Sequence, residues 1–493
     1  MSADRPLSRR AAEISVLALI LAAAAAARLW FLRAGIPHAV GIDEPAVVDR
    51  ALRILTTGSW NTHAFDYPSL VIYLHAIVAI VRFMAGAARG EWGSLQEYDI
   101  GALFVAGRVV TAAIGAATVW LVYEIGRRLH SHALGTVAAL ELALLSLHVR
   151  ESHFILTDVP VTALAALTIL LTIRARTWHT VAAYVLAGAA AGLTAAAKYN
   201  GGVVLLAPLV TWALDDWRSP GSARRGAAVL AGALLAFVAA SPFVVLDLPA
   251  FLNGFAAQMG RFALRRDYGQ AVGIIYLKHL QLQGVIWIAT AVAGALLTIV
   301  RPSLRRPWAP LLTFTGVYFY VLSTHTPVFA RYALPITPAL CLLSALVAVS
   351  LARAIGLLVG SSWVHRLALA GATAAIIFAP AAQTIKWVEG LKDRDTRAIA
   401  ADWLLNHTPR GARVVVENSG PTYLARDGLD VITVERLFDH PVARYRELGT
   451  GYLVISGGDL DRYAEYLAAG SLQFELLPAG SRKGPPIRIV RVE

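Results

Sequence analysis

Residues 11–45, AAEISVLALILAAAAAARLWFLRAGIPHAVGIDEP, place a pair of acidic residues shortly after a long apolar run. The run over residues 11–33 is long enough to cross a bilayer, which takes about 20 apolar residues. We interpret it as a retained first span, because it is long and no convincing small-residue cleavage site follows it. Asp43 and Glu44 therefore lie close to a membrane surface, where two carboxylates either serve a reaction or anchor a loop in water.

The chain as a whole is more apolar than one soluble core requires. Hydrophobic residues make up 57% of its 493 residues, charged residues make up 15%, and the mean hydropathy is +0.59. This composition predicts a multi-span membrane protein. The net charge of +12 does not indicate a nucleic-acid partner, because most arginines fall in short stretches between apolar runs. The single cysteine, Cys341, excludes an intramolecular disulfide and a cysteine metal cage.

Apolar runs recur along the first 385 residues. They lie near residues 11–33, 69–88, 101–126, 133–148, 159–174, 180–197, 201–216, 225–245, 284–300, 308–323, 331–352 and 366–385. Arginines between the runs indicate which runs cross, because arginine-rich loops stay cytoplasmic. From residue 127 onward such loops alternate with others, and they contain Arg127, Arg128, Arg174, Arg176, Arg218, Arg224, Arg225, Arg301, Arg305, Arg306, Arg353 and Arg366.

This alternation sets the predicted topology. With a cytoplasmic N-terminus, an even number of crossings must precede Arg127, so one of the first three runs does not cross. Residues 69–88 contain His75 and Arg82, and we interpret them as a juxtamembrane helix in the interface. About eleven transmembrane helices remain, and the loops that carry Asp43 and Asp158 lie on the extracytoplasmic face. If residues 69–88 crossed instead, the arginine-rich loops would lie outside.

The composition becomes that of a soluble protein from about residue 386. Strand-like runs at 413–417, 430–434, 452–456 and 487–492 are separated by helical stretches near 395–407 and 459–469. We therefore predict an all-α polytopic membrane protein over residues 1–385, followed by a small C-terminal α/β extracytoplasmic domain over residues 386–493. Within the membrane part, Gly188 and Gly192 indicate closely packed helices.

The first external loop carries the richest candidate chemistry. Residues 45–55 have the pattern of an amphipathic helix, with Asp49, Arg50 and Arg53 on its polar side. Asp43 and Glu44 then lie at the helix N-terminus, where a carboxylate serves as a cap. A helix cap accounts for one carboxylate of the pair, and the second carboxylate stays available for another role.

Further ionisable residues follow where other spans reach the same face. The stretch over residues 148–158, HVRESHFILTD, includes Glu151, His153 and Asp158, and charges beside lipid are usually paired or functional. Lys198-Tyr199-Asn200 and Arg331-Tyr332 add cations at this level. Either cation alone is explained by a side chain that reaches for the interface. Together with the carboxylates, they suit a reaction that deprotonates an acceptor and binds a departing phosphate.

Absent motifs narrow the reaction class. The sequence contains no G-x-S-x-G elbow, Walker loop, H-E-x-x-H or C-x-x-C. ATP-driven hydrolysis is therefore not supported, and the donor would arrive already activated. On the outer face of a membrane, a polyprenyl phosphate is the natural carrier of such a donor.

An ordered series of segments resembles a known family. The segments are GIDEPAVVDRALRILTTGSW, YPSLVIYLHAI, GRVVTAAIGAATVWLVYEIGRRL, RESHFILTDVP, GLTAAAKYNG and RYALPITPAL, and they extend over most of residues 10–350. The series is similar to the GT-C membrane glycosyltransferases, especially the protein O-mannosyltransferase and aminoarabinose-transferase branch. The resemblance implies transfer of a sugar from a polyprenyl-phosphate-linked donor to an acceptor on the extracytoplasmic face of the cell membrane.

The resemblance also implies roles for individual residues. Asp43 matches the catalytic base, Glu44 lies beside it, and Asp158 matches the acidic residue of the second external loop. Asp158 or Glu44 would orient the acceptor or hold a divalent metal ion, whose need stays open. The candidate substrate-binding residues are Arg50, Glu151, His153, Lys198, Tyr199, Arg331 and Tyr332, and Lys198 and Arg331 would contact the lipid phosphate.

One position departs from the family. In the aminoarabinose branch a lysine commonly precedes the proline that starts the helix near residue 69, whereas this chain has Asp66-Tyr67-Pro68. The sugar stays open, as does the choice of a protein, lipid or glycan acceptor. A transporter or lipid flippase is the alternative function, since many apolar runs and intramembrane charges would also serve one. A receptor or scaffold would not need acidic residues at the lipid surface.

Overall fold

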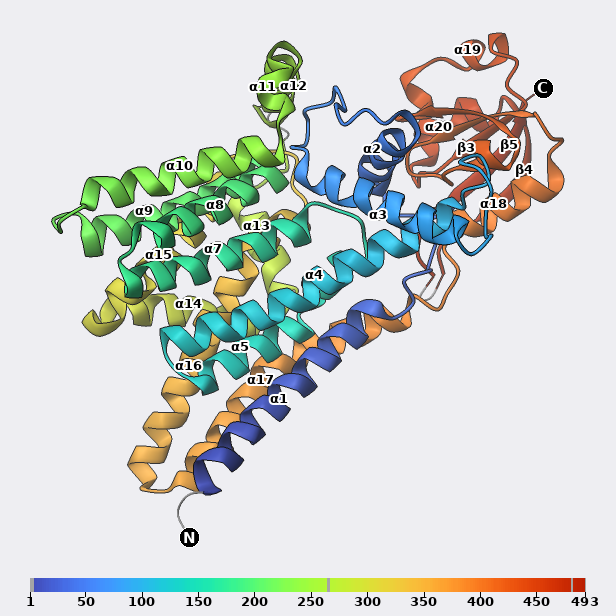
Figure 1. Cartoon of the computed structure of the whole chain (residues 1–493). Helices are drawn as coiled ribbons and strands as arrows, with labels where there is room; N and C mark the ends of the chain where they lie inside the picture. The colour runs from blue at the N-terminus through green and yellow to red at the C-terminus, as the bar shows by residue number, and fades with distance from the viewer. Residues whose placement is uncertain (1–3, 264–266, 480–481, 493) are drawn as a thin grey trace. The chain divides into compact units, whose positions relative to one another are not determined.

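The computed structural model describes residues 4–263, 267–479 and 482–492, and its chain is mostly helical with one small sheet near the C-terminus (Figure 1). The chain divides into two compact units. The first contains Met1–Trp30, Arg50–Ile80 and Arg108–Ile385, and the second contains Phe31–Asp49, Val81–Gly107 and Lys386–Glu493. Residues 31–49, which contain Asp43 and Glu44, therefore cluster with the C-terminal residues, whereas residues 50–80 belong to the first unit.

The helices of the first part of the chain have the following bounds. They are α1 (Asp4–Leu29), α2 (Glu44–Thr57), α3 (Leu70–Ala87), α4 (Ile100–Leu129), α5 (His132–Leu144), α6 (Ser146–Glu151), α7 (Asp158–Trp178), α8 (Val181–Ala197), α9 (Leu206–Thr211), α10 (Ser222–Ala240), α11 (Phe243–Leu246), α12 (Leu248–Ala263), α13 (Val272–Gln281), α14 (Val285–Val300), α15 (Pro302–Ser323), α16 (Thr337–Val359) and α17 (Ser362–Glu389). Short 3₁₀ segments η1 (Tyr199–Leu205) and η3 (Ala330–Ile336) and a π-helical segment η2 (Trp212–Asp216) interrupt the series.

Several of these helices have the length and composition of membrane spans. In the described residues seven qualify, namely Ala11–Leu29, Leu70–Ala87, Ile100–Leu129, Asp158–Trp178, Ser222–Ala240, Ala330–Val359 and Ser362–Glu389. An eighth is added if α13 and α14, which meet at a bend of 117°, form one broken span. The chain is thus a membrane protein, but the predicted count of about eleven is not confirmed. The apolar run over residues 201–216, for example, was counted as one span, but it is divided among η1, α9 and η2 and does not form one long helix.

The packing of α8 against α10 depends on two glycines. A Cβ atom added to Gly188 would lie 2.1 Å from the carbonyl oxygen of Val229, and one added to Gly192 would lie 2.1 Å from that of Ala233. Side chains at these positions would force the helices apart, because the opposing atoms belong to rigid backbone. The close packing predicted from these two glycines is confirmed, and the two helices lie side by side in Figure 1.

The amphipathic helix predicted over residues 45–55 is present as α2. Val47, Val48, Ala51 and Ile54 on one side of the helix are at most 2% exposed. Burial of this stripe holds the helix in place, since an amphipathic helix is stabilised mainly by the packing of its apolar face.

The C-terminal residues of the second unit form a five-stranded mixed sheet. Its strands are β1 (Arg413–Glu417), β2 (Asp430–Val434), β3 (Tyr452–Ile455), β4 (Gly470–Leu476) and β5 (Ile487–Val492), in the order β2-β1-β3-β5-β4. β1 pairs in parallel with β2 and β3, whereas β5 is antiparallel to both β3 and β4. The helices of this region are α18 (Thr396–His407), α19 (Val442–Glu447) and α20 (Leu460–Leu467).

Apolar residues cover both faces of this sheet. One core contains Val414, Val416 and Val454 with α18, and the other contains Val415, Leu453 and Ile455 with α19 and α20. The four predicted strands correspond to β1, β2, β3 and β5. The sequence reading missed β4, because this edge strand is half-exposed and lacks a continuous apolar run. It also missed α19, which is a short helix of six residues.

Candidate active site

Asp158 lies in the first unit against two cations. It is the first residue of α7 and is 3% exposed. Lys198 Nζ donates to Asp158 Oδ1 at 2.7 Å, and Arg331 Nε lies 3.7 Å from Oδ2. Taken by themselves, the three side chains carry one negative and two positive charges. The cluster therefore has a net positive charge that suits an anion.

Local backbone structure places these side chains. An acidic residue in the first turn of α7 is favoured by the helix dipole, and the nearby Pro160 is tolerated there because first-turn amides have no partner within the helix. Lys198 is the C-terminal cap of α8 and has an extended backbone, which turns the chain into η1. Gly201 permits this turn, since a Cβ atom there would lie 2.7 Å from the Thr194 carbonyl oxygen.

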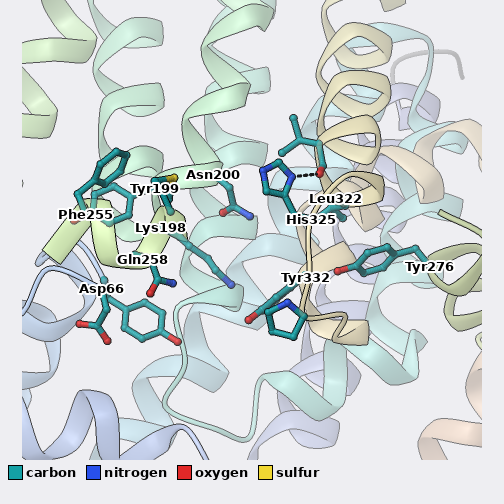
Figure 2. A pocket seen from close by; sticks show the side chains of 14 residues that line it. Asp66, Lys198, Tyr199, Asn200, Phe255, Gln258, Tyr276, Leu322, His325 and Tyr332 are labelled. Atoms are coloured by element: carbon teal, nitrogen blue, oxygen red, sulfur yellow. Dashed lines mark hydrogen bonds between the residues drawn. The ribbon is translucent and has the colours of Figure 1, made fainter. Parts of the chain in front are cut away.

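Aromatic rings hold both cations. Lys198 Nζ lies 4.2 Å from the ring centroid of Tyr332, and Figure 2 shows the two side chains directed toward each other. The guanidinium carbon of Arg331 lies 4.5 Å from the ring centroid of Phe329. A ring face attracts a cation without neutralising it. The rings thus restrict the positions of both cations.

A cavity of about 260 Å³ adjoins Lys198 (Figure 2). It is lined by Asp66, Tyr67, Lys198, Tyr199, Asn200, Phe255, Gln258, Met259, Tyr276, Val321, Leu322, His325, Pro327 and Tyr332. Tyr199 is fixed in the wall, because its hydroxyl donates to the Phe65 carbonyl oxygen at 3.0 Å and its ring meets Phe255 edge-on at 5.2 Å. A largely apolar lining with a few polar groups is typical of a site for an organic ligand.

Arg50 reaches the cavity wall through Asp66. Its Nη2 atom lies 2.8 Å from Asp66 Oδ1 and 3.0 Å from Oδ2. Asp66, two residues before Pro68, is thus already paired with a cation from α2. Sequence reasoning named Arg50 but not this pairing. It also missed Asn200 and Gln258 as lining residues, although Gln258 is one of the few polar residues of α12.

Glu151 and His153 are engaged with other groups and do not line the cavity. Glu151 is 4% exposed and lies 2.6 Å from Arg150 Nη2, and burial raises the pKa of its carboxyl group despite that arginine. The ring nitrogens of His153 face the carbonyl oxygens of Val149 at 2.9 Å and Trp30 at 3.0 Å, and burial lowers the pKa of His153 to about 4. His153 therefore connects the end of α1 to the second loop.

Asp43 and Glu44 belong to the second unit. Glu44 is the first residue of α2, is fully buried, and accepts a hydrogen bond at Oε2 from the Gly41 amide at 2.7 Å. Asp43 lies in the turn just before the helix and is half-buried. Glu44 thus stabilises the turn that precedes α2.

A metal site of protein ligands is not formed by the described residues. Among them, no group of three or more His, Cys, Asp or Glu side chains is placed to hold a metal ion. The described residues therefore do not indicate which side chains would bind the divalent ion whose need the sequence left undecided.

Comparisons with known proteins agree with this architecture. Residues 98–246 match the family described as dolichyl-phosphate-mannose-protein mannosyltransferase. A search of curated proteins found no match.

Two solved structures illustrate the similarity of fold. ArnT from Cupriavidus metallidurans, bound to undecaprenyl phosphate, has a TM-score of 0.62 and 15% identity over 97% of this chain and 97% of that one. The oligosaccharyltransferase AglB from Archaeoglobus fulgidus, in complex with an inhibitory peptide and a dolichol-phosphate, has a TM-score of 0.61 and 13% identity over 91% of this chain and 70% of that one. At these identities the structural likeness shows a common fold.

Proposed function

We infer from the family match over residues 98–246 and from the shared fold that the chain is a membrane glycosyltransferase of the GT-C type. On this basis we propose that it transfers a sugar from a polyprenyl-phosphate-linked donor to an acceptor on the extracytoplasmic face of the cell membrane. The observation that carries the proposal is the cluster of Asp158, Lys198 and Arg331, of which Lys198 lines the cavity. Its net positive charge suits a phosphate, and its apolar surroundings suit a lipid.

The cations would act on the leaving group. As the bond between the anomeric carbon and the phosphate oxygen breaks, negative charge grows on the departing polyprenyl phosphate. Lys198 and Arg331 are held beforehand by Asp158 and by aromatic rings, so they stabilise this charge without reorganising. Asp158 is engaged by both cations, and its role is to orient them. Phe255, Met259 and Leu322 in the lining offer apolar surface to the donor.

Asp43 would act as the general base. The acceptor nucleophile attacks the anomeric carbon and gives its proton to the Asp43 carboxylate, while the polyprenyl phosphate leaves from the opposite side and the anomeric centre inverts. Glu44 is buried and bonded to the Gly41 amide, which supports a structural role for it beside the base.

The ligands of the similar structures support the same donor. ArnT was solved with undecaprenyl phosphate, and AglB with a dolichol-phosphate and an inhibitory peptide. A polyprenyl phosphate is thus bound by two proteins of this fold. The acceptor of the present chain is a protein, a lipid or a glycan, and identification of the glycosylated product would decide among them.

The predicted division of the chain is part of this proposal. Residues 1–385 would form the catalytic membrane domain, and residues 386–493 would form a domain on the extracytoplasmic side. The arginine-rich loops support this orientation, because they fall in alternate connections that the positive-inside rule assigns to the cytoplasm.

Release of the lipid carrier tests the proposed reaction. We expect the purified protein in lipid, incubated with a panel of polyprenyl phosphate sugars and a membrane extract as acceptor source, to release free polyprenyl phosphate from one donor class. Chromatography of the extracted lipids measures the release, and heat-treated protein is the control. No release from any donor would overturn the proposal and favour a transporter, to be examined by flux across vesicles.

The phosphate contact predicts a binding defect in a Lys198→Ala variant. Loss of one charge-assisted hydrogen bond is expected to weaken polyprenyl phosphate binding roughly 10- to 100-fold. Titration calorimetry in detergent measures the affinity. Lys278→Ala is the matched control, because Lys278 is exposed and bonded to Gln270. Equal affinities of the Lys198→Ala variant and wild type would remove Lys198 from the phosphate site.

A further inference from the structure

The loop that precedes α2 is bonded to a C-terminal arginine. Arg397 Nη1 donates to the Val40 carbonyl oxygen at 2.8 Å, and Nη2 donates to that of Ala39 at 3.1 Å. Both acceptors are buried, at 0% and 6% exposure. All three residues belong to the second compact unit, and the acceptors lie only a few residues before Asp43. The guanidinium therefore holds the backbone close to the proposed base.

Arg397 is itself held in one orientation. Arg397 Nε donates to Asp395 Oδ1 at 2.9 Å, and Arg397 Nη2 donates to Asp395 Oδ2 at 3.0 Å. Asp395 Oδ1 also caps α18, because it accepts a hydrogen bond from the Arg397 amide at 2.9 Å. The side chain of Arg397 is only 12% exposed. A planar guanidinium can bridge a carboxylate and two carbonyl oxygens at once, whereas an ammonium group is a compact point charge that cannot match this geometry.

A second connection lies a little earlier in the loop. The Thr422 hydroxyl donates to the Pro37 carbonyl oxygen at 2.9 Å, and the Thr422 amide donates to that of His38 at 2.9 Å. His38 Nδ1 returns a hydrogen bond to the Thr422 carbonyl oxygen at 2.8 Å. These bonds join two backbone segments far apart in sequence, so they fix the entry of the loop.

A third connection is made at Asp49, which follows Asp43 in the chain. The Tyr423 hydroxyl donates to Asp49 Oδ1 at 2.9 Å, and its ring packs edge-on against Phe104 at 5.6 Å. Burial and the carboxylates of Asp49 and Glu44 raise the pKa of Tyr423, so its hydroxyl stays a donor. Tyr423 has a φ of +59°, which is unfavourable for a residue with a side chain. Such a conformation persists only where the surrounding contacts hold it.

We propose that Arg397 and Tyr423 are positioning residues that hold Asp43 at one place, by anchoring the chain on both sides of it at Ala39–Val40 and at Asp49. This inference rests on the proposed role of Asp43 as base. It gives the C-terminal domain a part in the chemical step, in addition to any part in acceptor choice. The physical reason is that a displacement of about 1 Å at a reacting group can lower a rate about 100-fold.

Loop mobility tests the anchor independently of activity. Cys341 is the only cysteine and is fully buried, while Ile42 beside Asp43 is 65% exposed. A nitroxide attached to an Ile42→Cys variant of the full chain in lipid therefore reports on the loop. We expect its spectrum to become more mobile with Arg397→Ala and to stay unchanged with Arg394→Ala, since Arg394 pairs with Asp402 at the surface and is 62% exposed.

Kinetics test the consequence for catalysis. Arg397→Ala is expected to lower turnover about 10- to 100-fold while polyprenyl phosphate binding stays at the wild-type value. Arg397→Lys should not restore turnover, because one ammonium cannot replace the bridging guanidinium. Tyr423→Phe keeps the ring against Phe104 and removes only the hydroxyl that bonds Asp49. We expect it to lower turnover less than Arg397→Ala does, in a protein whose packing is retained. Arg394→Ala should keep wild-type turnover.

The outcomes separate this inference from the proposed function. A label at position 42 that stays immobile in both Arg397→Ala and Tyr423→Phe would overturn the anchor, whatever the activity. A mobile label with unchanged turnover would overturn the positioning role. If wild type releases no polyprenyl phosphate from any donor, the proposed function fails, and the spectra still decide whether Arg397 and Tyr423 hold the loop.

Discussion

Asp43→Asn is expected to lower turnover about 10²- to 10⁴-fold, the usual contribution of a positioned general base. Asparagine has nearly the shape of aspartate but cannot accept the proton of the acceptor. Donor affinity should stay close to the wild-type value, because Asp43 is not among the groups proposed to bind the phosphate. Release of polyprenyl phosphate in single-turnover experiments measures the chemical step, and lipid titration measures donor affinity.

Two further variants sharpen the test of the base. Asp43→Glu keeps a carboxylate but moves it by one methylene, so its activity should fall between those of wild type and Asp43→Asn. Asp459→Asn is the matched control, since Asp459 is exposed and pairs with Arg462 at the surface of the same unit. A loss below about threefold in Asp43→Asn would exclude Asp43 as the base, because a general base contributes far more.

Glu417→Ala is expected to destabilise the C-terminal sheet by about 3–5 kcal/mol, the usual cost of leaving partners of a buried charge unsatisfied. The Glu417 side chain is fully buried at the end of β1. Oε1 accepts from the Leu437 amide at 2.9 Å and the Tyr463 hydroxyl at 2.8 Å, and Oε2 accepts from the Ser456 amide at 2.8 Å and its hydroxyl at 3.0 Å. Burial and Glu417 raise the pKa of Tyr463, which keeps its hydroxyl as a donor.

Hydrogen exchange in the full-length protein measures this loss. Amides of β1 and β3 should exchange faster in Glu417→Ala, and Glu417→Gln should show a smaller effect because its amide retains one acceptor oxygen. Glu435→Ala, which alters an exposed residue just after β2, is the control. Unchanged protection in Glu417→Ala would show that the hydrogen bonds of this carboxylate do not stabilise the sheet.

The sequence was most informative where physical chemistry acts locally. Strands β1, β2, β3 and β5 and helix α2 were predicted because each carries a short run or a periodic stripe of apolar residues in its sequence. The same reasoning missed β4, whose half-exposed edge position needs no such run. The predicted count of about eleven spans is not confirmed, because hydropathy shows that residues 201–216 are apolar but not that their backbone divides into η1, α9 and η2.

The candidate site could be predicted in part. Asp158, Lys198 and Arg331 stand out in sequence because charges beside apolar runs are costly. That Lys198 and Arg331 share one carboxylate depends on how η1 and η3 pack beside α7, which no local pattern encodes. Likewise the sequence shows an acidic residue, Asp66, two residues before Pro68, but its pairing with Arg50 requires the structure.

The sequence by itself determined that this is a membrane protein with a C-terminal α/β region, because hydropathy and periodicity are sums over neighbouring residues. Only the tertiary structure decided that Arg397 reaches the carbonyl oxygens of Ala39 and Val40 and that Tyr423 reaches Asp49. Every residue presents the same carbonyl oxygen, so a backbone acceptor leaves no mark in the sequence, and it becomes specific only when the fold brings a donor to it.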